Sequence, residues 1–442
     1  MNEATATYWP AGPHQPCEPL QWGTDLRLDD RRAVGRLDLP DLAADLLEVA
    51  TAIYATDRLV PRGPWRRRGY GDAWRRSLRV RIPVRSSRLW HDVRPHLTAM
   101  LSWLTDDVWT LEFAAGQGPL AKQQPLLPLS PSEVDVLLFS GGLDSTAGLA
   151  GDLSGAARDI IAVSVYTNSR MQARQREILG VLSRTAHRRA LPVQYKVQLR
   201  RKEREDSQRS RGFLFLAAGV ASAWALRRDR LRVHENGIGA INLPYLRSQV
   251  GSQATRAVHP RTVTMMEQLA RQLSGRPFTI ETPHLAMTKA ELVLACPAVA
   301  DGALGLSISC DYGFATRIPK TLACGACTSC LLRRQALHAA RRSDLDRGYR
   351  ANELVEEDRD GLNAMLWQLG RLRRCLGRSD AWGGLLAEFP QVVCASPRLG
   401  PESLTRLYRA YVDEWEDLPP LFGISQSAHV PAPREGGSAN AL

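Results

Sequence analysis

The chain has 442 residues, of which 44% are hydrophobic and 24% charged, a composition typical of folded globular domains. The longest apolar run, 213–226, is too short to span a bilayer, and the start of the chain lacks the features of a signal peptide, so we expect a cytoplasmic protein without a membrane segment. The formal charge is +12, and a basic surface favours acidic partners such as nucleotides, nucleic acid or an acidic protein.

The first part of the chain is expected to form an N-terminal α+β domain over residues 1–130. We expect irregular structure up to about residue 35 and then an amphipathic helix over 38–54, where leucines and alanines recur at helical spacing. The run 65–76 interleaves tryptophan with arginine. It could grip nucleic acid, but a solvated loop is the favoured interpretation. The remaining predicted elements are a strand over 78–84, a helix over 90–104, a strand over 108–113 and a linker over 116–131.

A regular alternation of apolar strands and helices begins at residue 134 and indicates an α/β domain over residues 131–345. Alternation of this kind predicts a parallel sheet with helices on both faces, and ligands of such sheets bind beyond the carboxyl ends of the strands. The five predicted strands are 134–139, 160–165, 193–199, 231–234 and 278–281.

The segment that follows the first of these strands is Ser140-Gly141-Gly142-Leu143-Asp144-Ser145, preceded by Phe139 and followed by Thr146. Two successive glycines let the backbone approach an anion, and hydroxyls and the free N–H groups of a helix N-terminus would surround it. No Gly-Lys-Ser/Thr follows, so the turn is not a Walker A loop. The pattern predicts a phosphate-binding turn in preference to an ordinary turn of small residues.

Four of the eight cysteines lie close together in the sequence, at Cys310, Cys324, Cys327 and Cys330. In a cytoplasmic chain such a cluster indicates a metal site and not disulfides. Four thiolates can complete a tetrahedron around Zn²⁺ with no position left open, which predicts a structural zinc site. An iron–sulfur cluster could use the same ligands, and four unlinked buried thiols are the plain alternative.

The end of the chain is expected to be helical over residues 346–424, most clearly at 354–375 and 403–415. The tail 425–442 is rich in Ser, Ala, Pro and Gly, and we expect it to be disordered.

The turn and the cysteine motif, with Arg333 three residues after the last cysteine, together resemble the 7-cyano-7-deazaguanine synthase (QueC) family. The segments Arg211–Ala218 and Thr282–Glu291 agree with this resemblance, which covers about 133–345. It implies a Rossmann-like PP-loop fold of the adenine nucleotide alpha hydrolase type, with a five-stranded parallel sheet. It also implies an enzyme that binds zinc and uses ATP and ammonia to convert 7-carboxy-7-deazaguanine to an amide and then a nitrile.

The resemblance assigns residues 139–146 to the pyrophosphate part of ATP. Asp144 would hold Mg²⁺, although a helix cap is the structural alternative, and Ser145 would contact the phosphates. Lys289 would bind the β and γ phosphates, and it also lies where Thr288 and Glu291 can form a capping box.

Three further residues are candidates for binding the nucleotide or its co-substrate. Arg211 could pair with a phosphate or with a substrate carboxylate. Glu235 and Asn236 follow the fourth strand of the α/β domain, and we expect them to read a guanine-like edge.

The chain departs from the nitrile-forming members of the family, which have Tyr-Pro-Asp-Cys-Arg where this chain has Leu243-Pro244-Tyr245-Leu246-Arg247. Its added N- and C-terminal regions resemble the enlarged QueC-like proteins of bacterial anti-phage systems, of the QatC type. That likeness implies that a deazaguanine carboxylate is joined to an amine, either ammonia or an amine of a partner protein of the defence system. A degenerate nucleotide-binding scaffold and a nucleobase or tRNA sulfur-transferase are the alternatives.

Overall fold

A computed structural model of the chain describes most of residues 5–416 and residue 422. The described residues are 5–9, 18–29, 37–62, 75–116, 120, 134–155, 158–167, 169–186, 188–245, 255–311, 323–346, 348–350, 354, 359–395, 397–416 and 422. Most of the arginine- and tryptophan-rich run, the linker, Leu246 and Arg247 and the expected disordered tail lie outside them.

The five predicted strands of the α/β domain lie in one sheet, and neighbouring pairs among them are parallel. They are β6 (Val134–Leu138), β7 (Asp159–Tyr166), β8 (Ala190–Leu199), β9 (Arg230–Val233) and β10 (Thr279–Glu281). Successive side chains of β6 alternate between two cores, because Val136 and Leu138 pack on one face of the sheet and Leu137 on the other. This double burial explains why the strand reads as a continuous apolar run.

The sheet has a sixth strand that the sequence did not predict. Strand β3 (Leu26–Asp29) pairs antiparallel with β8 and completes the order β10-β9-β6-β7-β8-β3. The expectation of irregular structure before residue 35 was therefore wrong, and so was that of a purely parallel five-stranded sheet. The division near residue 130 remains a prediction, but a strand from the N-terminal side of it belongs to the central sheet.

A second sheet is built from the N-terminal region in the order β2-β1-β4-β5. Its strands are β1 (Thr5–Trp9), β2 (Glu18–Gln21), β4 (Ser77–Val84) and β5 (Val108–Ala115), and α2 (Ser87–Thr105) connects the last two. Strands β4 and β5 are parallel, as a helical crossover requires. Strand β4 alternates buried and exposed side chains over its first half, as predicted from its sequence.

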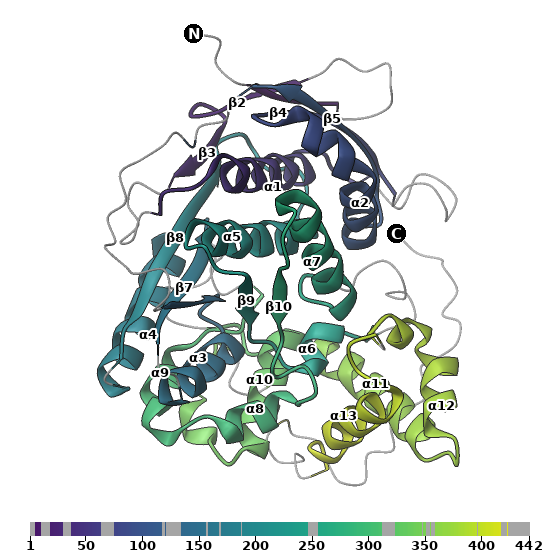
Figure 1. Ribbon diagram of the computed structural model, residues 1–442. Helices are drawn as coiled ribbons and strands as arrows, with labels where there is room; N and C mark the ends of the chain where they lie inside the picture. The colour runs from purple at the N-terminus through teal and green to yellow at the C-terminus, as the bar shows by residue number, and fades with distance from the viewer. Residues whose placement is uncertain are drawn as a thin grey trace.

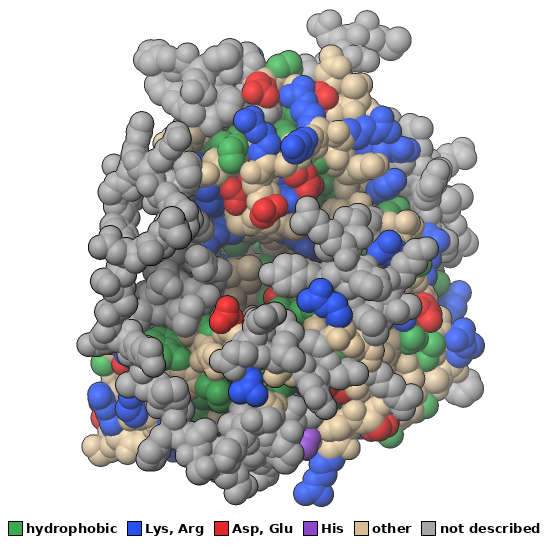
Figure 2. All heavy atoms as spheres, turned by 180° about the vertical axis from the view of Figure 1, so that it is seen from behind, with side chains coloured by type: hydrophobic (Ala, Val, Ile, Leu, Met, Phe, Trp, Pro, Cys, Tyr) green, Lys and Arg blue, Asp and Glu red, His purple; other side chains and the backbone are tan. Residues whose placement is uncertain are grey.

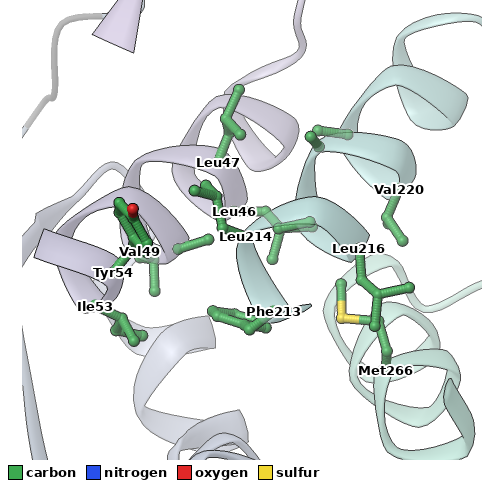
Figure 3. Packing of buried hydrophobic residues seen from close by; sticks show 14 of the residues in the cluster. Leu46, Leu47, Val49, Ile53, Tyr54, Phe213, Leu214, Leu216, Val220 and Met266 are labelled. Carbon is green, nitrogen blue, oxygen red and sulfur yellow. The ribbon is translucent and has the colours of Figure 1, made fainter. Parts of the chain in front are cut away.

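Helix α1 (Asp41–Leu59) lies between the two sheets and packs against α5 (Arg211–Ala225), as Figure 1 shows. Its apolar residues meet Phe213 and Leu214 of α5 in the core drawn in Figure 3. The predicted amphipathic character was wrong, because almost every side chain of α1 is buried. Its acidic side chains pair instead with arginines of other elements, for example Asp45 with Arg85.

Helices cover both faces of the central sheet (Figure 1). Helices α5 and α7 (Pro260–Ser274) share the core that also contains α1. The opposite core contains side chains from five helices, namely α3 (Leu143–Gly155), α4 (Ser169–Thr185), α8 (Lys289–Ala295), α9 (Asp301–Leu306) and α10 (Thr328–Ala339).

The region after residue 346 is helical, as predicted, and forms a third core with the short helix α6 (Gly237–Ile241). Its helices are α11 (Asp360–Leu376), α12 (Ala381–Glu388) and α13 (Pro401–Asp413). Helix α13 reaches back to α6, which follows β9, so the C-terminal region packs against the carboxyl end of the central sheet.

Two observations bear on the partners of the protein. Among the helices described, none is long and apolar enough to cross a bilayer. On the face in Figure 2, the described Lys and Arg side chains are interspersed with acidic ones and do not merge into one basic surface. Arg76, at the end of the arginine-rich run, is buried and bonded to Asp57 and Asp107, so it is used inside the protein.

Candidate functional site

The predicted phosphate-binding turn lies at the carboxyl end of β6 and leads into α3. Gly141 has φ +81°, a conformation that favours glycine, and its carbonyl accepts a hydrogen bond from Ile308 N at 3.1 Å. Phe139 is buried in the core, and Thr146 Oγ1 donates to Gly142 O at 2.8 Å. These two residues therefore support the turn from inside the protein.

The hydroxyl and N–H groups of the turn point toward one another. Ser140 Oγ lies 3.0 Å from Ser145 Oγ and accepts from Gly142 N at 3.2 Å. Leu143 N donates to Ser309 Oγ at 3.3 Å. These are long bonds to neutral hydroxyls, and a phosphate oxygen would be the stronger acceptor for the same N–H groups. Anion binding by the turn remains a prediction, and these N–H and hydroxyl groups are the ones that would serve it.

Two residues that the sequence did not single out also hold this turn. Gln175 of α4 donates from Nε2 to Ser140 O at 3.2 Å, and Ser309 contacts Leu143 N as described. Their sequence neighbourhoods carry no motif, so only the fold brings them to the turn.

Asp144 and Lys289 form a buried ion pair below the turn, with exposures of 4% and 7%. Asp144 does not cap α3. Its Oδ1 accepts from Lys289 Nζ, while its Oδ2 accepts from Asn236 N at 3.1 Å and Asn236 Nδ2 at 2.6 Å. The capping box of Thr288 and Glu291 is present at the start of α8, and it leaves the Lys289 side chain directed inward.

Asn236 is engaged at both ends of its side chain. Its amide nitrogen donates to Asp144, and its oxygen accepts from Gly239 N at 3.0 Å and caps α6. It therefore joins the end of β9 to the site. Recognition of a guanine-like edge by Glu235 and Asn236 stays a prediction.

Glu235 lies beside the ion pair and is hydrogen-bonded to Asp144. Burial and the neighbouring Asp144 carboxylate raise its pKa well above the usual value. Gly239 makes room for this carboxyl, because a Cβ there would lie 2.6 Å from Glu235 Oε1. The site thus groups one lysine with two carboxyls, and Glu235 is the carboxyl whose pKa is raised.

Two cavities meet at the turn and share Ser140, Gly142, Ser145 and Glu235. The smaller cavity, about 520 Å³, extends toward Tyr245 and is lined by Asp144 and Lys289. The larger, about 830 Å³, extends along the start of α5. Each volume is within the range of small-ligand sites.

Arg211 lines the larger cavity at the start of α5, with its guanidinium carbon 5.0 Å from the centre of the Phe215 ring. Burial lowers its pKa, and nearby Arg58 lowers it further. Among the described residues no carboxylate pairs with this guanidinium. A negatively charged ligand would relieve this uncompensated charge.

The four cysteines come together in one group, with all four sulfur atoms within 4.8 Å of one another. Cys324 Sγ and Cys330 Sγ lie 3.8 Å apart, which matches the edge of a tetrahedron with Zn–S bonds of about 2.3 Å. Gly325 has φ +84° and makes the turn between two of the ligands. The donor set and spacing fit zinc, and these residues would hold it without an open coordination position.

The segment around Cys310, which we call the metal loop after its predicted role, lies beside the predicted phosphate-binding turn. Ser309 and Ile308, which contact the turn, immediately precede the ligand Cys310, and Cys310 lines both cavities. On the other side, Arg333 donates to Ser307 Oγ at 2.6 Å and Arg334 to Gly325 O at 3.4 Å. Both arginines therefore brace the loop from α10.

Comparison with known families gives a match over part of the chain. Residues 257–341 match the family model described as queuosine biosynthesis protein QueC, which supports a QueC-like family for this chain. The matched segment contains Lys289 and all four cysteines but not the turn at Ser140–Ser145. None of the curated protein sequences matches the chain.

Proposed function

We propose that the protein is an ATP-dependent ligase that adenylates the carboxylate of a 7-deazaguanine and transfers the acyl group to an amine. The carboxylate oxygen attacks the α-phosphorus of ATP, and pyrophosphate leaves. The amine then attacks the acyl carbon, AMP leaves with the bonding electrons, and the amine loses a proton. The QueC match supports this class of reaction.

The observation that carries the proposal is the glycine turn placed beside Lys289 where the two cavities join. Ser140, Gly142 and Ser145 would bind the pyrophosphate through N–H and O–H groups. Lys289 would supply the positive charge that compensates the leaving group, because such reactions depend mainly on positioning and electrostatic stabilisation.

The two cavities suit two substrates on either side of the turn. We place the ATP nucleoside in the larger cavity, where Met171 and Phe215 offer apolar surface and Arg211 offers a charge. The deazaguanine would occupy the smaller cavity, where a base carbonyl would accept the Glu235 O–H in place of Asp144.

Metal ions would have separate roles in this scheme. Zinc on the four cysteines would fix the wall formed by Ser309 and Cys310. Mg²⁺ would reduce the charge of the phosphates, with Asp144 as its protein ligand. Since Asp144 Oδ1 already pairs with Lys289, the cation would have to share this oxygen with the lysine.

The acceptor amine and the biological setting are the boldest parts of the proposal. Ammonia would give an amide, whereas an amine of a partner protein would give a conjugate. We propose the second, within an anti-phage defence system, because the enlarged chain resembles proteins of such systems. A degenerate nucleotide-binding scaffold is the main competitor, and the complete turn and buried Lys289 argue against it.

Sulfur transfer is less well supported. It would need a redox-active cysteine at the site, and Cys310 is the one cysteine among the described residues that lines either of these cavities. Cys310 belongs to the four-thiol group.

The test is pyrophosphate release by the zinc-loaded protein with ATP and 7-carboxy-7-deazaguanine, with and without ammonia. We expect release that depends on the carboxylate, and a mass gain on a co-purified partner when that partner supplies the amine. Absence of carboxylate-dependent release under every amine condition would contradict the proposed reaction.

A further inference from the structure

The larger cavity has two walls that come from different parts of the chain. One wall is the segment 203–212, which leads into α5 and contains Arg209 and Arg211. The other is the segment 255–258, which leads into α7. The walls touch at Gly212, where a Cβ would lie 2.4 Å from Ala257 Cα.

Asp106, at the end of α2 in the N-terminal region, joins these two walls. It adopts the left-handed conformation, with φ +62°, and ends the helix. One of its carboxylate oxygens accepts from Arg209 Nη1 at 2.7 Å, and the other accepts from Arg256 Nη1 at 2.9 Å. One N-terminal carboxylate therefore bonds to an arginine in each wall.

Trp103 of α2, close to Asp106 in the sequence, also contacts the second wall and the start of α7. The guanidinium carbons of Arg256 and Arg261 lie 4.3 and 4.5 Å from the centre of its ring. Its Nε1 donates to Thr262 Oγ1 at 2.9 Å. These contacts fix the start of α7 to the end of α2.

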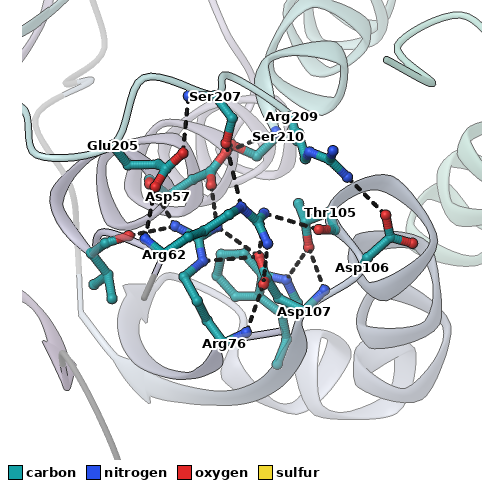
Figure 4. A network of polar contacts seen from close by, with 12 residues as sticks. Asp57, Arg62, Arg76, Thr105, Asp106, Asp107, Glu205, Ser207, Arg209 and Ser210 are labelled. Carbon is teal, nitrogen blue, oxygen red and sulfur yellow. Dashed lines mark hydrogen bonds and ion pairs between the residues drawn. The ribbon is translucent and has the colours of Figure 1, made fainter. Parts of the chain in front are cut away.

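A buried ionic network holds the first wall in the same way (Figure 4). Asp57 of α1 accepts from Ser210 N at 2.9 Å and from Ser210 Oγ at 2.8 Å. Glu205 accepts from Arg62 N at 2.7 Å. Both walls are thus anchored to the N-terminal region, and Asp106 is the residue that they share.

The charges explain what Asp106 contributes. Arg209 is surrounded by other arginines, and burial together with Arg62 and Arg256 lowers its pKa to about 10, against the opposing effect of Asp106. Without the Asp106 carboxylate, Arg209 and Arg256 would each lose an ion pair, and the repulsion between their charges would push the two walls apart.

We propose that Asp106 is a positioning residue that sets the spacing of the two walls and thereby the affinity of the larger cavity for the nucleotide. The N-terminal region is then a working part of the binding site and not an appended module. The identity of the ligand rests on the proposed function, whereas the link between Asp106 and the two walls does not.

The test compares Asp106→Asn and Asp106→Glu with wild type and with Asp92→Asn, which changes an exposed aspartate of the same helix. Two quantities are measured in the zinc-loaded full chain. They are the Kd for ATP with Mg²⁺ by titration calorimetry, and the hydrogen exchange of peptides covering 203–212 and 255–262 without nucleotide. A thermal melt of each variant establishes that it is folded.

We expect Asp106→Asn to raise the Kd about tenfold and to speed exchange in both peptides. Asp106→Glu should restore part of the affinity, and Asp92→Asn should behave as wild type. Unchanged exchange in either peptide of a folded Asp106→Asn protein would overturn the proposal, as would an unchanged Kd. If wild type itself does not bind ATP, the proposed function fails, and the exchange result still decides whether Asp106 holds the walls.

Discussion

At the scale of single residues, the buried group of Asp144, Lys289 and Glu235 is the centre of the proposed site. Its members come from α3, α8 and the end of β9, and the pKa of Asp144 is lowered while that of Glu235 is raised. The sequence indicated all three residues but not their contacts, because Asp144 and Lys289 are 145 positions apart. Asp144 could be interpreted as a helix cap only as long as its partner was unknown.

The role of Lys289 can be separated from its role as the counter-ion of Asp144. Lys289→Met alone leaves a buried carboxylate without its cation and should destabilise the fold by about 3–5 kcal/mol. The double variant Asp144→Asn, Lys289→Met removes both charges and should recover most of this loss. Activity should stay at least about 100-fold below wild type in both, because the phosphates lose their cation.

These variants are checked by denaturant unfolding and by pyrophosphate release. Lys202→Met is the matched control, since Lys202 is an exposed lysine. Near wild-type turnover in the double variant would show that the lysine serves only to neutralise the aspartate.

Glu235 should give the pH–rate profile an alkaline limb. Burial and Asp144 raise its pKa, so its neutral, hydrogen-bond-donating form persists to higher pH than in an ordinary carboxyl, and it becomes a second anion beside Asp144 as the pH rises through that pKa. Glu235→Gln keeps a neutral donor at every pH, and we expect its profile to lose that limb. An identical limb in wild type and Glu235→Gln would assign the titration to another group.

At the scale of elements, the metal loop and the turn form one unit, since Ile308 and Ser309 bond to the turn and Cys310 follows at once. The spacing of the cysteines predicted that the four thiols would come together, because closely spaced pairs of cysteines are typical of metal sites, and the structure brings them together. The neighbouring turn could not be predicted from spacing, since it depends on how β6 and α10 are placed.

Removing zinc should therefore weaken nucleotide binding as well as stability. We expect one zinc per chain by metal analysis, and loss of ATP binding when a chelator or Cys327→Ser removes the metal. Cys375→Ser, which changes a buried cysteine outside the four-thiol group, should keep both metal and binding. Full ATP affinity in metal-free, folded protein would show that ATP binding at the turn does not depend on the metal loop.

The C-terminal helix α13 also reaches the site, through Glu414. This carboxylate accepts from Thr288 Oγ1, next to Lys289, and from Gln335 Nε2 of α10 at 2.9 Å. Burial raises its pKa to about 7 against the opposing effect of these two bonds.

Because the folded protein binds this proton more tightly than the unfolded chain, the contribution of Glu414 to stability is fully present below about pH 4.5 and is lost as the pH rises through about 7. Across this pH range the contribution of Glu414 to the free energy of unfolding changes by about 3 kcal/mol. In Glu414→Gln the free energy of unfolding should depend less on pH between about 4.5 and 7, as measured by urea denaturation at several pH values. If the free energy of unfolding depends on pH equally in the variant and in wild type, groups other than Glu414 cause that dependence.

At the scale of the whole molecule, periodicity predicted the elements better than their arrangement. The strands of the central sheet could be predicted because burial on both faces leaves a continuous apolar run. Strand β3 was missed because it has only four residues, with charged side chains at alternate positions. Helix α1 was misjudged because its polar face looks solvated until the arginines that cover it are known.

The contacts of the N-terminal region with the rest of the chain also lack a local sequence signal. Asp57, Asp106 and Asp107 each resemble ordinary surface acids in the sequence, and only the fold places arginines from other segments against them. Long-range ion pairs of this kind have no local signal, so the bonds between the N-terminal region and the two walls of the larger cavity could not be predicted from the sequence.

Everything in the proposed function requires that ATP binds over the turn at Gly141 and Gly142. Calorimetric titration of ATP with Mg²⁺ into zinc-loaded protein addresses this requirement. Wild type is compared with the double variant Ser140→Ala, Ser145→Ala and with Ser154→Ala, which changes an exposed serine of helix α3. We predict saturable binding to wild type and Ser154→Ala, and affinity at least about tenfold lower when both turn hydroxyls are removed. Absence of ATP binding to wild type, or equal ATP affinity in wild type and in the double variant, would contradict the requirement that ATP binds over this turn.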